Sequence, residues 1–139
     1  MASRYHLAGT PDWSNASSWH DGVYGASAVP LDGDSVYFLE GSDAVTTGMA
    51  LLAAGDDLAL ISESPGFSGS VGTAGSPLQL IGTNTQSLVF NKGGPGRWNV
   101  QGQIPTLRMR NGYLGLYTGE VLDGIVSGGE ALFADSCDL

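Results

Sequence analysis

The sequence has little charge, very little positive charge and almost no cysteine. Charged residues make up 14% of its 139 positions, and five lysines and arginines stand against fourteen aspartates and glutamates, for a net charge of −9. An acidic chain repels nucleic acid and anionic membranes, so we expect neither as a partner. The single cysteine, Cys137, excludes an intramolecular disulfide and a cysteine-based zinc cluster.

Long apolar runs are missing as well. No stretch is long enough to cross a bilayer, and the first five residues are not followed by the apolar core of a signal peptide, so we expect synthesis in the cytoplasm. Glycine, in contrast, is abundant, at 22 residues in a chain that is 42% hydrophobic. This length and composition predict a single domain, residues 1–139, built from many short strands and tight turns.

Short apolar segments recur from residue 35 onward and indicate an all-β core over residues 35–139. The first is residues 35–39, and several later segments alternate apolar and polar side chains, as in residues 78–80 and 107–109. Such alternation is typical of a strand with one buried face. Because the spacing between segments is irregular, we expect an irregular β-solenoid, similar to a β-helix, with a β-sandwich or jelly roll as the alternative.

Two segments depart from the strand pattern. Residues 44–60 are the one helical candidate, but Gly48 and Gly55 interrupt the pattern and leave room for a single turn at most. Residues 64–77 are nearly all Gly, Ser, Thr and Ala around Phe67. Their composition predicts either a mobile loop or an extended arm that becomes ordered on a partner.

The polar residues do not form a recognisable active site. The two histidines, His6 and His20, lie near aspartates, but no Gly-x-Ser-x-Gly turn supplies a nucleophile for a hydrolase. The acidic residues within residues 32–43 lack the order of an EF-hand loop, and turn formation explains them better than calcium binding. Residues 93–96 are glycine-rich but lack the Lys-Ser/Thr of a phosphate-binding loop. We therefore expect no catalytic residue, no metal and no cofactor.

Charge is segregated along the chain. Residues 64–119 contain no acidic residue, whereas four of the five basic residues lie there: Lys92, Arg97, Arg108 and Arg110. The pattern predicts either an accidental patch or a positive face for an acidic partner, including a neighbouring copy of the chain. Since Arg108 and Arg110 lie two apart on one predicted strand, they would also suit a carbohydrate groove.

The first 34 residues form a lead-in with the composition of a loop. Two of the three tryptophans, Trp13 and Trp19, lie there among Ser, Asn, Gly and Pro. The turn-forming residues around them predict a segment that docks onto the start of the β-structure.

The lead-in carries a motif that runs from Arg4 to Phe38. It reads Arg-Tyr, then Gly-Thr, Trp-Ser and Ser-x-Trp, and ends with Val-Pro followed by Asp-x-Val-x-Phe. The motif resembles the start of many small bacteriophage virion proteins, and related lead-ins open β-helical bacterial surface proteins. The resemblance covers about a quarter of the chain, and His6 stands where that family often has a second aromatic residue.

The resemblance implies a non-enzymatic virion structural protein. Within this class it implies a capsid decoration, or cement, protein that binds the major capsid protein on the outer surface of the phage head, as a homo-oligomer and most often a trimer. The chain has no heptad run for a stalk, which favours decoration over a tail-fibre or tail-tip protein that binds host carbohydrate. A polysaccharide-degrading β-helix enzyme is a further alternative.

Aromatic side chains and arginines dominate protein interfaces, so we expect the contacts of the assembly to come from them. The predicted interface residues are Trp13, Trp19, Tyr37, Phe67, Arg97, Arg108 and Arg110. An equally open alternative for the tryptophans and Tyr37 is that they close one end of the β core.

Overall fold

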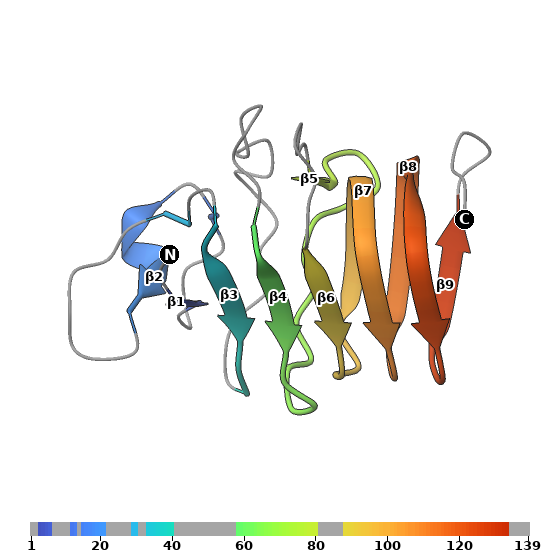
Figure 1. Cartoon of the computed structure of the whole chain (residues 1–139). Coiled ribbons are helices and arrows are strands. Elements are labelled where there is room, and N and C mark those ends of the chain that lie inside the picture. The colour runs from blue at the N-terminus through green and yellow to red at the C-terminus, as the bar shows by residue number, and fades with distance from the viewer. Residues whose placement is uncertain are drawn as a thin grey trace.

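A computed structural model of the chain describes residues 3–6, 12–13, 15–21, 29–30, 33–40, 58–80 and 88–133. Within these ranges the regular structure is β, as predicted, apart from one 3-10 turn, Ala16–Ser18 (Figure 1). The strands are β1 (Ser3–His6), β2 (Trp19–His20), β3 (Ser35–Phe38), β4 (Leu60–Glu63), β5 (Leu78–Leu80), β6 (Val89–Lys92), β7 (Arg97–Met109), β8 (Tyr113–Val126) and β9 (Glu130–Phe133). No helix in the described ranges is long and apolar enough to span a membrane.

The nine strands form one mixed, largely parallel sheet. Its order is β2-β1-β3-β4-β6-β7-β8-β9, with β5 paired to β7 beside this path, and only the β1–β2 pair is antiparallel. Figure 1 shows β3, β4 and β6 side by side with the lower parts of β7 and β8. The sandwich or jelly-roll alternative is therefore wrong for the described strands, because it requires two packed sheets of antiparallel strands.

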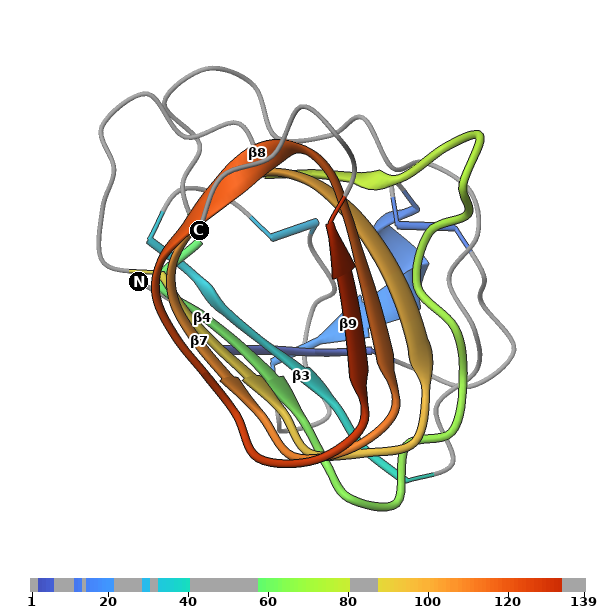
Figure 2. The same cartoon turned by 90° about the vertical axis from the view of Figure 1, so that its right-hand side faces the viewer.

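The two long strands, β7 and β8, follow the same bent course (Figure 2). Residues 100–102 of β7 pair with β5, and residues 106–109 pair with β6, so β7 pairs with two different strands along its length. The β7–β8 register shifts between Gln101 and Gly102. Gly102 has a φ of +120°, and a side chain there would collide with the carbonyl of Leu80, so the bend requires glycine.

The core is built from rows of side chains that cross the parallel strands. In β3, β4 and β6 every second residue is buried, which is the expected pattern for one buried face. The pairing register aligns these residues from strand to strand. One buried row consists of Val36, Ile61, Phe90 and Leu107. The next consists of Phe38, Glu63, Lys92 and Met109.

The lead-in contains more regular structure than its composition predicts. Strand β1 pairs in parallel with β3, with Arg4 opposite Val36, and β2 extends the sheet on the other side of β1. The loop composition of residues 1–34 thus does not reveal the two short strands β1 and β2. The prediction of a strand at residues 35–39 is confirmed to within one residue.

The Gly/Ser-rich segment 64–77 packs against the chain's own core. Val71 forms a parallel bridge with Trp98, and both Phe67 and Val71 are fully buried. The composition predicts a mobile loop or an extended arm that becomes ordered on a partner, whereas in this structure two apolar side chains anchor the segment to the core of its own chain. The predicted helical segment, residues 44–60, lies outside the described residues except at its end, where Leu60 begins β4.

Candidate functional site

The two tryptophans of the lead-in lie inside the molecule. Trp13 and Trp19 have no exposed area, and their rings meet edge to face at 4.9 Å. The indole N–H of Trp19 donates a hydrogen bond to the carbonyl of Trp13 at 3.0 Å. The ring centroids of Trp13 and Trp19 lie 6.1 and 5.8 Å, respectively, from that of Phe38. This is the geometry of an end cap, since a side chain without exposed area touches no partner in this conformation.

Phe67 joins the same aromatic cluster. It has no exposed area, and its ring centroid lies 5.3 Å from that of Phe38. Trp98 meets Phe38 from the other side at 5.0 Å. The structure therefore places three of the seven predicted interface residues, Trp13, Trp19 and Phe67, in the core.

Both histidines pack against aromatic rings. His6 is buried, stacks on Phe38 at 5.4 Å and meets Trp19 edge to face at 5.1 Å. His20 stacks on Tyr5 at 5.3 Å, and Tyr5 stacks on Tyr37 at 4.8 Å. Tyr37 is only half-buried, so it is the one predicted aromatic contact that keeps exposed area in this chain.

Asp34, one of the acidic residues considered for calcium binding, lies next to an arginine. The Asp34 carboxylate lies 3.7 Å from the Arg4 guanidinium, which links the turn before β3 to β1. Asp32 and Asp43 lie outside the described residues. Among the residues that the structure does describe, no three potential metal ligands come together.

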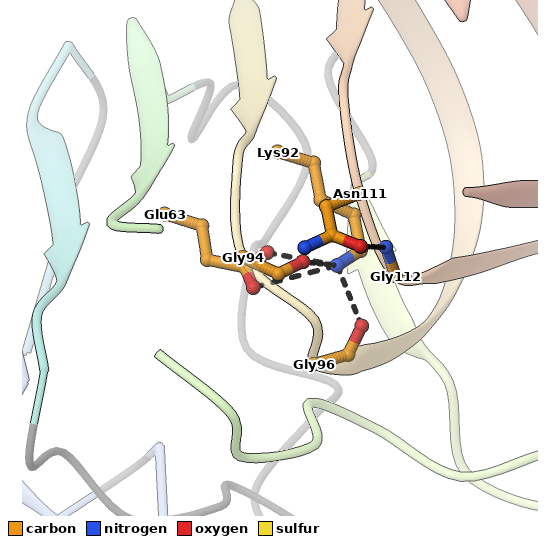
Figure 3. A network of polar contacts seen from close by, with 6 residues as sticks. All are labelled: Glu63, Lys92, Gly94, Gly96, Asn111 and Gly112. Carbon is orange, nitrogen blue, oxygen red and sulfur yellow. Dashed lines mark hydrogen bonds and ion pairs between the residues drawn. The ribbon is translucent and has the colours of Figure 1, made fainter. Parts of the chain in front are cut away.

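An ion pair that the sequence analysis missed lies at the centre of the sheet. Lys92 Nζ lies 3.0 Å from Glu63 Oε2, and both side chains are fully buried (Figure 3). They occupy adjacent places in the buried row between Phe38 and Met109. The signal was present in the sequence, because the alternation that buries Ile61 in β4 also buries Glu63 two residues later.

The ammonium of Lys92 is fully coordinated. Besides Glu63 it donates hydrogen bonds to the carbonyls of Gly94, at 3.0 Å, and Gly96, at 2.6 Å. Burial raises the pKa of Glu63 to about 7, although the Lys92 charge and the Gly96 N–H act in the opposite direction. Burial likewise lowers the pKa of Lys92. Since neither side chain reaches the surface, the pair joins β4, β6 and the turn after β6 and offers no site for a ligand.

Gly112 closes the space around the ammonium. Its φ is +78°, and a Cβ there would lie 2.5 Å from both Lys92 Nζ and the Gly96 carbonyl oxygen. The Gly112 N–H donates to the side-chain oxygen of Asn111 at 2.8 Å, which holds this turn in place (Figure 3). Only glycine fits both the backbone conformation and the space.

The four basic residues of residues 64–119 do not form one positive face. Lys92 is internal, and the Arg97 guanidinium lies 4.0 Å over the Tyr113 ring. Arg108 pairs with Asp123 at 3.2 Å, whereas Arg110 is exposed in the turn after β7. The prediction of a positive patch is wrong for Lys92, whereas Arg97 and Arg108 lie in β7 and Arg110 follows it.

The β9 side of the sheet is its open end. Strand β9 pairs only with residues 113–116 of β8, so within the described chain the outer edge of residues 119–126 carries no strand. Figure 2 looks at the molecule from this side. Four of the five large hydrophobic side chains that are exposed in the described residues lie here: Leu122 (58%), Ile125 (54%), Val126 (46%) and Leu132 (50%). Sequence analysis did not distinguish these from core residues.

Comparison with known proteins gives no relative. The sequence matches no protein-family model, and neither curated proteins nor solved structures give a significant match.

Proposed function

We propose that the chain is a non-enzymatic structural protein of a bacteriophage virion, a capsid decoration protein that binds the outer surface of the head and stabilises contacts between capsomers. The observation that supports it is the difference between the two ends of the sheet. Buried aromatic rings close the lead-in end, whereas in the part of the chain that the structure describes the β8–β9 end presents an unpaired strand edge with exposed apolar side chains. Free strand edges and contiguous apolar surface are features of assembly sites.

We also propose that the parallel sheet winds as an irregular β-solenoid. Arg97 of β7 pairs with Tyr113 of β8, and Tyr113 pairs in turn with Glu130 of β9. Each passage of the chain thus returns to the same column of residues, and a stack of this kind ends in an open edge unless something covers it.

The major capsid protein is the proposed partner for the exposed polar contacts. Arg97, Arg108, Arg110 and Tyr37 keep exposed or half-exposed surface in this chain and remain the candidate contacts. The assembly on the head is a homo-oligomer in this proposal, and the resemblance implies a trimer. Weak contacts repeated over a capsid lattice gain strength by multivalency.

Binding to undecorated heads tests this function. Purified protein is mixed with heads that lack decoration, and bound protein and the temperature of head disruption are measured after sedimentation. We expect saturable binding and greater heat resistance, and weaker binding for Arg110→Glu than for the surface control Gly75→Ala, whose added methyl meets no atom within 4 Å. Absence of binding at any concentration would overturn the proposal.

A second candidate function has one observation in its favour. A row of half-buried aromatic and polar side chains crosses the outer face of the sheet, where the stacked rings of His20, Tyr5 and Tyr37 continue in register into Ser62 and Asn91. Aromatic and amide side chains in a row suit carbohydrate, which is the chemistry of a tail-fibre or tail-tip protein. Binding on a glycan array, without binding to heads, would replace decoration by this function.

A further inference from the structure

We infer that the edge of β8 that is unpaired in the described part of the chain binds a second copy of the chain, in an antiparallel two-fold contact centred on Gly124 that replaces the trimer implied by the resemblance. The inference rests on the proposed function in assigning the open end to assembly, and it adds the identity and geometry of the partner there. A two-fold contact makes the same surface of both copies bind itself, so one self-complementary edge is sufficient.

The backbone of this edge is ready to pair. Residues 123–126 of β8 are in register with residues 106–109 of β7, and the N–H of Ser127 donates to the Met109 carbonyl at 2.8 Å. Backbone N–H groups alternate in direction along a strand. The N–H groups of Gly124 and Val126 therefore point away from β7, toward the open side.

The side chains of residues 122–126 favour a register centred on Gly124. With Gly124 opposite its equivalent, Leu122 lies opposite the partner's Val126, and Asp123 lies opposite the partner's Ile125. A contact centred on Asp123 would place two carboxylates directly opposite each other, which is destabilising. A contact centred on Ile125 would overlap only residues 124–126 of each strand. The register centred on Gly124 covers the exposed apolar residues and avoids like charges.

Charge is balanced in this arrangement. Arg108 stands next to Ile125 across the β7–β8 pair, and it holds Asp123 of its own chain at 3.2 Å. The two-fold axis brings the Arg108–Asp123 pair of each copy to the contact. Each Asp123 then faces the partner's Ile125, and the partner's Arg108 lies next in the same row across the sheet. At the dyad itself glycine presents no side chain, and the two backbones can approach to pairing distance.

Sedimentation of the full-length chain over a range of concentrations tests the inference. We expect a reversible monomer–dimer equilibrium, and at least a tenfold weaker dimer for Ile125→Asp, which places a carboxylate opposite the partner's Asp123. The matched control is Leu39→Asp, the same kind of change at a 43% exposed site away from the edge, and we expect it to dimerise like the wild type. A monomeric wild type, a trimer, or an unchanged Ile125→Asp dimer would overturn the inference.

A charge exchange tests the register itself. Asp123→Lys together with Ile125→Asp places each new lysine opposite the partner's new aspartate only if Gly124 is the centre, so we expect the double variant to recover dimerisation. Continued loss of the dimer would exclude this register. Failure of the inference and of the proposed function are separable: a monomer that still binds heads overturns the inference alone, and a dimer that does not bind heads overturns the function alone.

Discussion

Replacing Lys92 with methionine removes the cation that faces the buried Glu63 carboxylate and leaves a side chain of similar length in its place. Breaking a buried ion pair by removal of one partner costs about 3–5 kcal/mol, because the remaining charge is uncompensated. The carbonyls of Gly94 and Gly96 also lose their donor, and a buried acceptor without a partner costs about 1–3 kcal/mol. At pH 8, where Glu63 is ionised in the wild type, we expect Lys92→Met to lower the free energy of unfolding by at least about 4 kcal/mol, a large share of the ~5–15 kcal/mol of a typical domain.

Urea denaturation measures this change directly, through the midpoint at constant m-value. The matched variant Glu63→Leu/Lys92→Met removes both charges, and we expect it to recover about 2 kcal/mol or more of the loss, because replacement of a buried ion pair by apolar residues is often neutral. A Lys92→Met variant within about 0.5 kcal/mol of the wild type would mean that the ion pair does not stabilise the fold. A double variant that is less stable than the single one would mean that the uncompensated charge of Glu63 does not cause the loss.

The same variant has a pH signature. The pKa of Glu63 is about 7 in the folded chain, above its ordinary 4.5, so the folded state binds this proton more tightly than the unfolded state does. Its contribution to stability is present below pH 4.5 and is lost as the pH rises through about 7. Without Lys92 the carboxyl is harder still to ionise, so we expect the Lys92→Met loss to be larger at pH 8 than at pH 5. An equal loss at both values would mean that the charge of Glu63 does not cause it.

Three further predictions follow from the same contacts. In the wild type, the free energy of unfolding attributable to Glu63 falls between pH 4.5 and about 7, and Glu63→Gln removes this component of a stability–pH profile. Gly112→Ala lowers stability by about 2–4 kcal/mol in urea denaturation, because a left-handed φ and a collision with Lys92 act together, whereas Gly75→Ala stays within about 0.5 kcal/mol. Trp13→Ala lowers stability by about 3–5 kcal/mol by opening the aromatic end cap, and its affinity for heads, measured well below its melting temperature, stays unchanged; a loss of affinity by the folded variant would contradict the cap assignment.

Local pattern was sufficient for the elements with clear alternation. In β3, buried Val36 and Phe38 alternate with half-buried residues, and the residues of β4 and β6 alternate in the same way. This alternation makes the strands predictable. Strand β1 was missed because Arg4, Tyr5 and His6 contain no such apolar period. Its place in the sheet depends on Val36, far along the chain, and pairing at that separation leaves no local signal.

The buried ion pair was missed for a different reason. Charged residues are rarely buried unless paired, so the sequence places Lys92 in a candidate positive patch and gives Glu63 no role. Their pairing depends on the register of β4 against β6, which the sequence does not specify by itself. The open end could not be predicted either, because Ile125 and Val126 are apolar like core residues. They differ from core residues in that no described strand pairs with the outer edge of β8 there.

The copy number of this protein in the particle that contains it shows whether the protein decorates the capsid. Quantitative mass spectrometry of purified particles gives the ratio of the chain to the major capsid protein. A capsid decoration protein is expected in a copy number comparable to that of the capsid protein or a simple fraction of it. A small fixed number of copies per particle, or none, would contradict the account.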